Sequence, residues 1–167
     1  MSKPQRDVAA TAAERMPLYT YPEPRADRDA KDVLPLTFAG APVLREPARA
    51  VRIEDIPSTD IQTLLARMIR TMRAAPGVGL AAPQVGVNLR IAVIEDRDDV
   101  AGGRRVDDGR DRQSLPVLAL INPEIQRVAK VARPVFHEGC LSVPGYTAEV
   151  QRDLEVVVTG LDGYGKP

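Results

Sequence analysis

A single cysteine and a single histidine lie three residues apart in this sequence, as His137 and Cys140. A thiolate can act as a nucleophile or as a metal ligand, and the nucleophilic role calls for a base beside it. If the segment from Phe136 to Leu141 is extended, residues three apart point to opposite faces of the strand. The sequence therefore disfavours a Cys-His dyad, and we interpret His137 as a solvated or edge histidine.

The histidine count also limits the metal sites that the sequence can form. Zinc-type and iron-type hydrolase sites usually take two or three imidazoles, and a catalytic zinc has about three protein ligands. With only His137 and Cys140 available, we expect that the sequence does not complete such a site alone. The ordinary alternative for Cys140 is a small buried apolar residue, as free cysteines often are.

Two glycines and an amide form a second candidate cluster, Gly77, Gly79 and Gln84. With Ala82 the glycines match a G-x-G-x-x-A pattern, but the dinucleotide-binding version of that pattern follows a strand and opens a helix. Here the pattern follows a predicted helix and runs into Pro83. One interpretation is a helix end and a turn. The other is a ligand site, because glycines let a ligand approach the backbone and Gln84 adds an amide donor.

Together, the segments GVGLAAPQ (Gly77 to Gln84) and EGCLS (Glu138 to Ser142) resemble the first and second signature motifs of peptide deformylases. The resemblance covers about residues 35–167. The family's third motif, a His-Glu-x-x-His helix, is absent from the sequence, and the tail VVVTGLDGYGKP resembles the strand and turn that precede it. The resemblance implies an α+β fold of short, mainly antiparallel strands around helices, without the C-terminal metal-binding helix.

The reaction implied by this resemblance is metal-dependent hydrolysis of the formyl group from the N-terminal formylmethionine of nascent proteins. In the family a divalent metal, commonly Fe²⁺ and replaceable by Ni²⁺, Co²⁺ or Zn²⁺, is held by the cysteine of the second motif and two histidines of the third. Cys140 would be one ligand, and Gln84 and the backbone N–H of Leu141 would stabilise the oxyanion. The implied substrate-binding residues are Gly77, Gly79, Leu80, Glu138 and Gly139.

Three interpretations of the function follow from these motifs. The first is an incomplete domain of an ordinary deformylase, inactive as these 167 residues because the third motif is missing. The second is an inactive paralogue that serves as a peptide-binding module. The third is a metal-free thiol hydrolase that uses Cys140, which the strand geometry supports least. The implied partners are formylmethionyl nascent peptides and, transiently, the ribosome.

Composition excludes several other classes of protein. The formal net charge is zero with a pI near 6.6. Basic and acidic residues are interspersed, so no stripe of one sign can follow a nucleic acid backbone. No apolar run of ~18 residues is present to span a bilayer. The lone cysteine rules out an internal disulfide and the N-terminus lacks an apolar signal region, so we predict a cytoplasmic location.

An amphipathic helix is the clearest element that must position the motifs. Thr59 and Gln62 predict a capping box at its start, and Pro76-Gly77 predicts its end. Its apolar stripe, at i, i+3, i+4, i+7, i+8 and i+11, consists of Ile61, Leu64, Leu65, Met68, Ile69 and Met72.

Two segments rich in Ile, Val and Leu, residues 89–95 and 115–121, predict buried strands. Between them the charged run from Asp96 to Ser114 predicts a surface loop. A third strand is predicted at 154–159, followed by a turn at 162–165. We expect this strand to lack the returning partner of its hairpin, which leaves an unpaired edge.

The start of the chain differs from the rest in composition. Residues 1–35 mix prolines, charges and alanines without any period, which predicts a disordered N-terminal extension. Residues 36–167 would then form the incomplete deformylase-like domain. Within it, the apolar stretch from Leu36 to Leu44 predicts either a strand or a docked coil.

Overall fold

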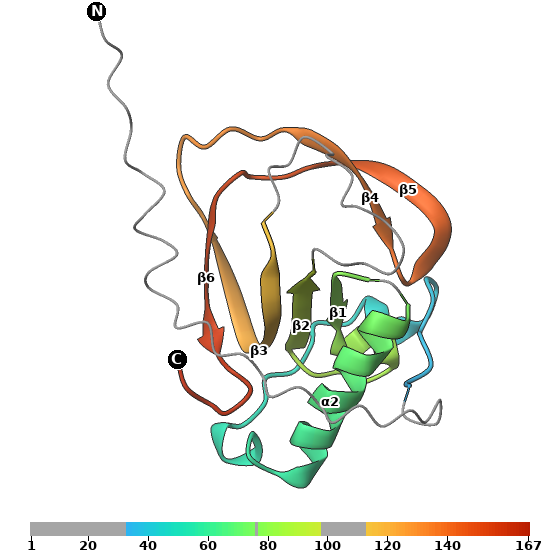
Figure 1. Ribbon diagram of the computed structural model, residues 1–167, viewed down its shortest axis with the longest axis vertical. Coiled ribbons are helices and arrows are strands. Elements are labelled where there is room, and N and C mark those ends of the chain that lie inside the picture. The colour runs from blue at the N-terminus through green and yellow to red at the C-terminus, as the bar shows by residue number, and fades with distance from the viewer. Residues whose placement is uncertain (1–32, 76, 98–112) are drawn as a thin grey trace, which may run out of the picture.

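The computed structural model describes residues 33–75, 77–97 and 113–167. In this part of the chain, helix α2 (Thr59–Ala74) packs on a four-stranded sheet of order β1-β2-β3-β6 (Figure 1). Those strands are β1 (Gly79–Ala81), β2 (Ile91–Asp96), β3 (Leu115–Arg127) and β6 (Val156–Leu161). A separate two-stranded ribbon consists of β4 (Val135–Cys140) and β5 (Val143–Gln151). All strand pairs are antiparallel, which confirms the predicted α+β class.

Helix α2 begins one residue away from the predicted cap. Ser58 is the N-cap, and its hydroxyl accepts a hydrogen bond from the N–H of Ile61 at 3.4 Å. The capping box predicted from Thr59 and Gln62 is therefore wrong, because Ser58 already satisfies the first free N–H groups. The side-chain amide of Gln62 instead donates to the carbonyl oxygens of Ile56 at 2.9 Å and Gly163 at 2.8 Å, which joins the helix start to the turn after β6.

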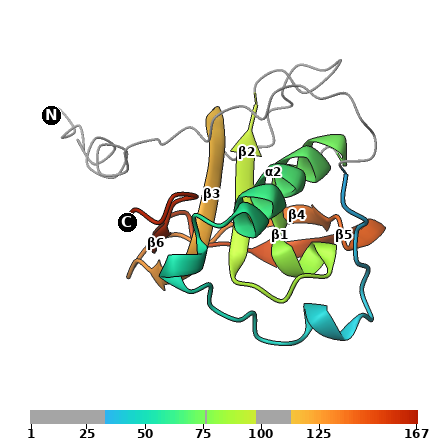
Figure 2. The same cartoon turned by 90° about the horizontal axis from the view of Figure 1, so that it is seen from below.

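The core lies between α2 and one face of the sheet, and Figure 2 shows the helix crossing β1 and β2. Five of the six residues of the apolar stripe predicted for the helix are buried here, and Leu64 is half-buried. Full burial of one such side chain contributes about 1.5–3 kcal/mol, so this layer is the main source of stability. The fully or nearly fully buried residues are Leu65, Met68, Ile69 and Met72 from the helix, and Leu80, Ile91, Val93, Val117, Ala119 and Ile121 from the sheet.

Strand β3 extends six residues past its predicted end at Ile121, because a bulge carries it through Asn122 and Pro123. Asn122 has a positive φ of 53°, a conformation that asparagine tolerates better than most residues. Beyond the bulge, β3 pairs with β6. The predicted last strand thus has β3 as a partner on one edge, and within the described ranges no strand pairs with its other edge.

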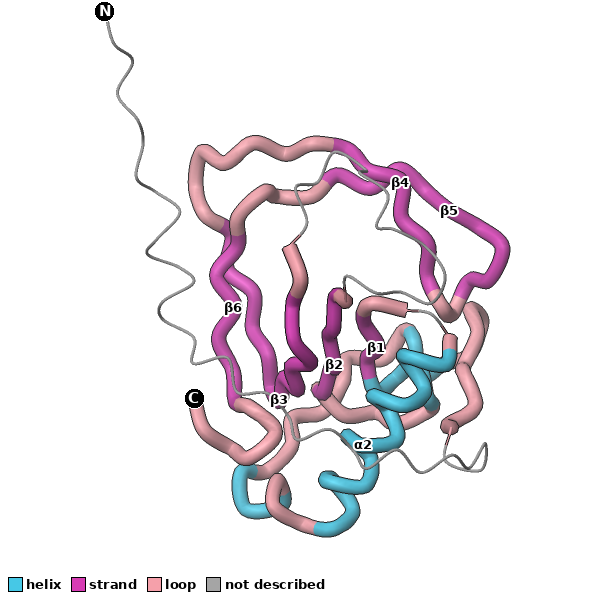
Figure 3. Tube along the Cα trace, in the orientation of Figure 1, coloured by secondary structure: helices cyan, strands magenta, loops and turns pink. Residues whose placement is uncertain are grey.

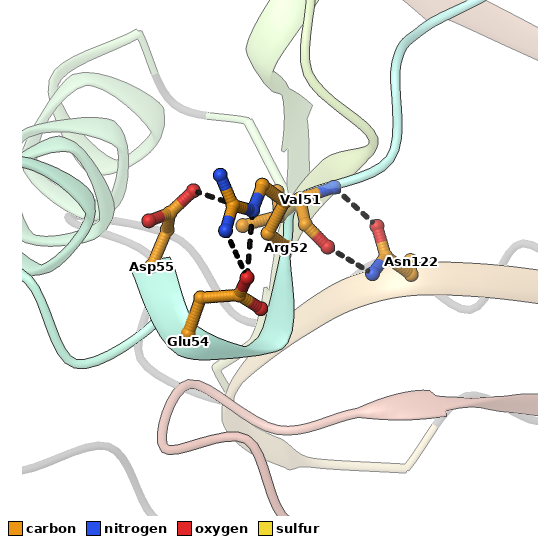
Figure 4. A network of polar contacts seen from close by, with 5 residues as sticks. All are labelled: Val51, Arg52, Glu54, Asp55 and Asn122. Carbon is orange, nitrogen blue, oxygen red and sulfur yellow. Dashed lines mark hydrogen bonds and ion pairs between the residues drawn. The ribbon is translucent and has the colours of Figure 1, made fainter.

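The side chain of Asn122 acts as a substitute for a neighbouring strand (Figure 4). Its Oδ1 accepts from the N–H of Val51 and its Nδ2 donates to the C=O of Val51, both at 2.8 Å. In the same view Arg52 pairs with Glu54 and, at 3.9 Å, with Asp55. One amide thereby satisfies both backbone groups of a buried residue and fixes the coil that precedes α2.

The β4–β5 ribbon differs from the sheet in having most of its residues exposed. Figure 3 shows it as a pair of strands joined to β3 and β6 by loops. Its register runs from Val135 opposite Gln151 to Gly139 opposite Thr147, and then shifts so that Cys140 lies opposite Val143. The two residues between the strands form a tight turn.

The stretch from Leu36 to Leu44 is a docked coil that ends in a short 3-10 turn, η2 (Pro42–Leu44), which decides between the two alternatives left by the sequence. The predicted disordered extension and the predicted surface loop lie mostly outside the described residues, at 1–32 and 98–112. No α-helix in the described ranges combines the length and the apolar character needed to cross a membrane.

Candidate functional site

A cleft of about 840 Å³ opens where the coil after residue 33, the α2–β1 connection and the β4–β5 turn meet. None of its lining residues carries a charged side chain. It is lined by Leu36, Phe38, Ala75, Gly77, Val78, Gly79, Gln84, Gly139, Cys140, Leu141, Val143, Pro144, Gly145 and Tyr146. A cleft of this size and polarity suits a ligand that is mostly apolar and held by a few polar groups.

Gln84 lies at the junction of these segments, on the 3-10 turn η4 (Ala82–Val85) that follows β1. Its Oε1 accepts a hydrogen bond from the N–H of Ala81 at 2.9 Å. Its Nε2 donates to the hydroxyl of Ser142 at 3.3 Å and to the Sγ of Cys140 at 3.7 Å. Because the oxygen is held by the backbone, the NH₂ group is directed toward the turn of the ribbon.

The two glycines of the first motif differ in how much space surrounds them. The N–H of Gly77 donates to the C=O of Met72 at 2.9 Å, so this glycine closes the end of α2. A Cβ on Gly77 would lie 2.9 Å from Cδ1 of Leu141, so any side chain would displace that leucine. A Cβ on Gly79 would meet only the carbonyl oxygen of Val93 at 3.7 Å, which is an ordinary contact. Packing therefore constrains position 77, through the Leu141 side chain, more than position 79.

Cys140 is exposed at the end of β4, so its interpretation as a buried apolar residue is wrong. The register shift of the ribbon places it beside the turn, where it faces the amide of Gln84. His137 lies on the same strand with 71% of its side chain exposed, and its Nε2 is 3.8 Å from Oε1 of Glu149 on β5. This exposure agrees with the interpretation of His137 as a solvated histidine.

The side chains described do not fit a resident metal ion. Within residues 33–75, 77–97 and 113–167, no three His, Cys, Asp or Glu side chains lie together as a possible ligand set. Glu138, the carboxylate of the second motif, pairs with Arg152 at 2.7 Å, and this hydrogen bond raises the pKa of the Arg152 guanidinium. Cys140 is thus the one candidate ligand among the residues that line the cleft.

The structure brings most of the predicted site residues to this cleft, namely Gly77, Gly79, Gln84, Gly139, Cys140 and Leu141. Two others lie elsewhere. Leu80 is 2% exposed and packs in the core, because β1 alternates and turns this side chain toward α2. Glu138 lies against Arg152.

Sequence reasoning missed the part of the cleft contributed by Phe38 and Tyr146, and it gave no role to the side chain of Ser142, which contacts Gln84 beside the cleft. Phe38 belongs to the coil that was noticed only as an apolar stretch, and Tyr146 follows the second motif in the ribbon. Ser142 is 5% exposed, and its carbonyl oxygen accepts from the N–H of Ala39 at 2.8 Å. The available signal was the position of Ser142 within the second motif.

Comparison with known proteins agrees with these motifs. The model of the family described as "Polypeptide deformylase" matches residues 33–167. The chain is 44% identical over 139 residues to "Peptide deformylase 1A, chloroplastic" of Solanum lycopersicum, covering 81% of this chain and 50% of that protein. It is 47% identical over 137 residues to "Peptide deformylase 3" of Streptomyces avermitilis, covering 80% and 58%. A "Peptide deformylase" of Xylella fastidiosa is 42% identical over 133 residues, covering 80% and 69%. The chain spans about half the length of the tomato protein.

Solved structures show the same likeness in three dimensions. A class I type b peptide deformylase from Acinetobacter baumannii, bound to Met-Ala-Ser, superposes with a TM-score of 0.69 at 30% identity, covering 80% of each chain. A peptide deformylase from Synechococcus elongatus in complex with actinonin gives a TM-score of 0.64 at 38% identity, covering 83% of this chain and 65% of that one.

Proposed function

This chain belongs to the peptide deformylase family, and from that premise we propose that it takes part in hydrolysis of the formyl group from the N-terminal formylmethionine of nascent proteins. The observation that carries the proposal is the meeting of both motifs in one uncharged cleft, with Nε2 of Gln84 3.7 Å from Sγ of Cys140. An uncharged cleft suits the methionine side chain, and the amide and thiol lie together at the point where chemistry would occur.

Gln84 and Leu141 are the proposed oxyanion donors. Since Oε1 of Gln84 is held by the N–H of Ala81, the amide NH₂ is directed toward Ser142 and Cys140. The backbone N–H of Leu141, next along the chain from Cys140, is the second proposed donor. One well-placed donor of this kind is worth about 3 kcal/mol in the transition state, or roughly 10²- to 10³-fold in rate.

The backbone of the substrate is proposed to lie beside Gly79. Strand β1 is an edge of the four-stranded sheet, so one side of its backbone can pair with an extended peptide. Gly79 leaves room for this approach, and packing does not otherwise account for a glycine there. The bound Met-Ala-Ser peptide in the Acinetobacter relative supports a peptide of this kind as the ligand.

The family is metal-dependent, and we propose Cys140 as the ligand that this chain contributes, with Fe²⁺ as the first choice and Zn²⁺, Ni²⁺ or Co²⁺ as substitutes. One thiolate gives too few ligands for stable binding. The sequence contains one cysteine and one histidine, and we propose that His137 is not a ligand. We therefore expect the 167-residue polypeptide to retain no stoichiometric metal at neutral pH and to release no formate.

The test compares this polypeptide with a version extended by a His-Glu-x-x-His helix from a relative. Metal content and formate release from formyl-Met-Ala-Ser are measured for both, and we expect both properties only in the extended version. There, Cys140→Ala should abolish metal retention and activity together, whereas the control His137→Ala should leave the metal content intact. Metal-free activity of the 167-residue polypeptide that His137→Ala removes would instead support the thiol-hydrolase interpretation.

A second candidate function is a peptide-binding module without catalysis. It is favoured by the cleft itself, whose lining residues carry no charged side chain. Binding of formyl-Met-Ala-Ser without formate release, even in the extended version, would support it over the enzyme. For either function we propose a cytoplasmic location and a transient encounter with the ribosome. The relative from Solanum lycopersicum is named as chloroplastic.

A further inference from the structure

The hydroxyl of Ser142 is nearly buried, and the proposed function gives it no part in holding the substrate backbone or the oxyanion. Only 5% of this residue is exposed. Its Oγ accepts a hydrogen bond from Nε2 of Gln84 at 3.3 Å. We infer that Ser142 is a positioning residue, which holds the amide of Gln84 in the rotamer that presents an N–H to the formyl oxygen. This inference rests on the proposed function and deepens it.

The geometry of the Gln84 amide supports the inference. A glutamine amide has one oxygen that accepts and two N–H groups that donate. Here Oε1 is held by the N–H of Ala81 at 2.9 Å, and one N–H is held by Ser142. The other N–H donates to Sγ of Cys140 at 3.7 Å, and this is the donor that the formyl oxygen would take over. Holding both ends of the amide prevents the exchange of its oxygen and nitrogen.

Without the hydroxyl of Ser142, only the contact with Ala81 would orient this amide firmly. The terminal torsion of glutamine has broad minima, and a free glutamine side chain has substantial rotamer entropy. Gln84 would then spend less time with its N–H directed toward the formyl oxygen. The loss should therefore appear in recognition of the formyl group and not in recognition of methionine.

Ser142 also joins the three segments that form the cleft. Its carbonyl oxygen accepts from the N–H of Ala39, and the carbonyl oxygen of Gln84 accepts from the N–H of Thr37, both at 2.8 Å. With the contact between Gln84 and Ser142, these hydrogen bonds close a ring through the coil, η4 and the ribbon turn. The backbone part of the ring does not depend on the hydroxyl, so substitution of the hydroxyl alone should leave the turn in place.

The experiment measures the affinity of the 167-residue polypeptide for formyl-Met-Ala-Ser and for Met-Ala-Ser by titration calorimetry. The ratio of the two dissociation constants reports recognition of the formyl group. Ser142→Ala should reduce this preference for the formylated peptide about three- to tenfold, which is the range expected for one hydrogen bond, and leave the affinity for Met-Ala-Ser unchanged. Ser142→Thr, which keeps the hydroxyl, should restore the preference.

A double-mutant comparison separates positioning from a general structural effect. In a Gln84→Ala background, Ser142→Ala should change the ratio no further, because the hydroxyl acts through the amide. Thr159→Ala, which removes an exposed hydroxyl on β6 outside the cleft, serves as the matched control and should change neither affinity. If Ser142→Ala lowers the melting temperature, Ser142→Cys, of similar size but a weaker acceptor, should show the same reduced ratio.

Two results would overturn the inference in different ways. An unchanged ratio in Ser142→Ala, or an equal change with and without Gln84, would exclude positioning by Ser142 while the proposed function stands. Failure of both the unsubstituted polypeptide and the version extended by the His-Glu-x-x-His helix to bind either peptide would overturn the proposed function, and the inference with it.

Discussion

The body of the molecule, formed by α2 and the four-stranded sheet, is more deeply buried than the β4–β5 ribbon. In the body, side chains such as Leu65 and Val93 are completely buried. In the ribbon, residues on both strands are exposed, including Val135 at 54% and Tyr146 at 74%. The candidate site nevertheless takes Gln84 from the body and Cys140 from the ribbon. The amide of Gln84 thus comes from the well-packed body, and the thiol of Cys140 comes from the more exposed ribbon.

This difference shows that the position of Cys140 depends on a few contacts at the ribbon turn. An isolated two-stranded ribbon is marginally stable in water, so the ribbon cannot maintain its place through its own core. The contacts that hold it are the hydrogen bonds to Ser142 and the packing of Leu141 near Gly77. Substitutions in the body should therefore change global stability, whereas substitutions in the ribbon should change binding with little effect on stability.

The largest effect is expected from a cavity in the body. Leu65→Ala removes a fully buried side chain of α2 and should lower the free energy of unfolding by about 2–5 kcal/mol. Val135→Ala on β4 of the ribbon, where the residue is 54% exposed, is the matched control and should cost less than about 1 kcal/mol. Chemical denaturation monitored by circular dichroism measures both. An equal loss of unfolding free energy in the two variants would contradict the distinction between body and ribbon.

The second-largest effect on stability is expected at Asn122, whose side-chain amide takes the place of a strand partner for Val51. Asn122→Ala leaves the N–H and C=O of buried Val51 without their partners and places alanine at positive φ, so we expect a loss of about 2–4 kcal/mol. Asn122→Gly removes the same hydrogen bonds without the backbone strain and should cost less. If the two variants unfold at the same denaturant concentration, the backbone conformation contributes nothing to the effect.

In the ribbon the expected change is in binding. Tyr146→Ala truncates a cleft residue that is 74% exposed, so the melting temperature should hardly change. Loss of this contact should weaken binding of formyl-Met-Ala-Ser by about 1–2 kcal/mol, or roughly tenfold. Tyr164→Ala, at a tyrosine outside the cleft lining, is the control and should bind normally. A large drop in the melting temperature of Tyr146→Ala would show that the ribbon contributes to the core after all.

The smallest effect concerns pH and the loops that join the ribbon to the sheet. Asp153 pairs with Arg127 at 2.9 Å and Arg133 at 2.8 Å, and the hydrogen bond from Arg127 holds the pKa of Asp153 below its ordinary value. A carboxyl with a lowered folded-state pKa stabilises the fold above its unfolded pKa of about 3.9 and loses that contribution as the pH falls through the folded pKa.

Melting temperatures of the wild type and Asp153→Asn between pH 2 and 6 test this expectation. The wild type should be slightly more stable near pH 6, and the difference should shrink below about pH 4. A difference that stays constant to pH 2 would show that the charge of Asp153 is not its source.

Much of the body could be predicted from the sequence because burial on one face imposes a period. The stripe from Ile61 to Met72 follows the helical repeat, and the Ile- and Val-rich segments correspond to β2 and the first half of β3. The prediction stopped β3 at Ile121, since Asn122 and Pro123 normally interrupt a strand and a bulge has no period of its own.

The candidate site could be predicted only in part, because tertiary contacts determine which residues line the cleft. Gln84 and Cys140 were identified through their motifs, whereas Phe38 and Tyr146 come from segments without a chemical signal. Leu80 was assigned to the substrate because it lies within the first motif, but the alternation of β1 directs it into the core. Motif membership therefore indicated which segments line the cleft and did not predict the direction of each side chain.

The close approach of Gly77 to Leu141 has a consequence for recombination between relatives. A side chain at position 77 would occupy the space of the leucine, so the two motifs share one steric constraint although 64 positions separate them in the chain. Chimaeras that exchange residues 77–84 together with residues 138–142 should keep this fit. A crossover placed between the two segments would combine surfaces that have not been selected for each other, and alanine at position 77 should be accepted where position 141 carries a smaller side chain.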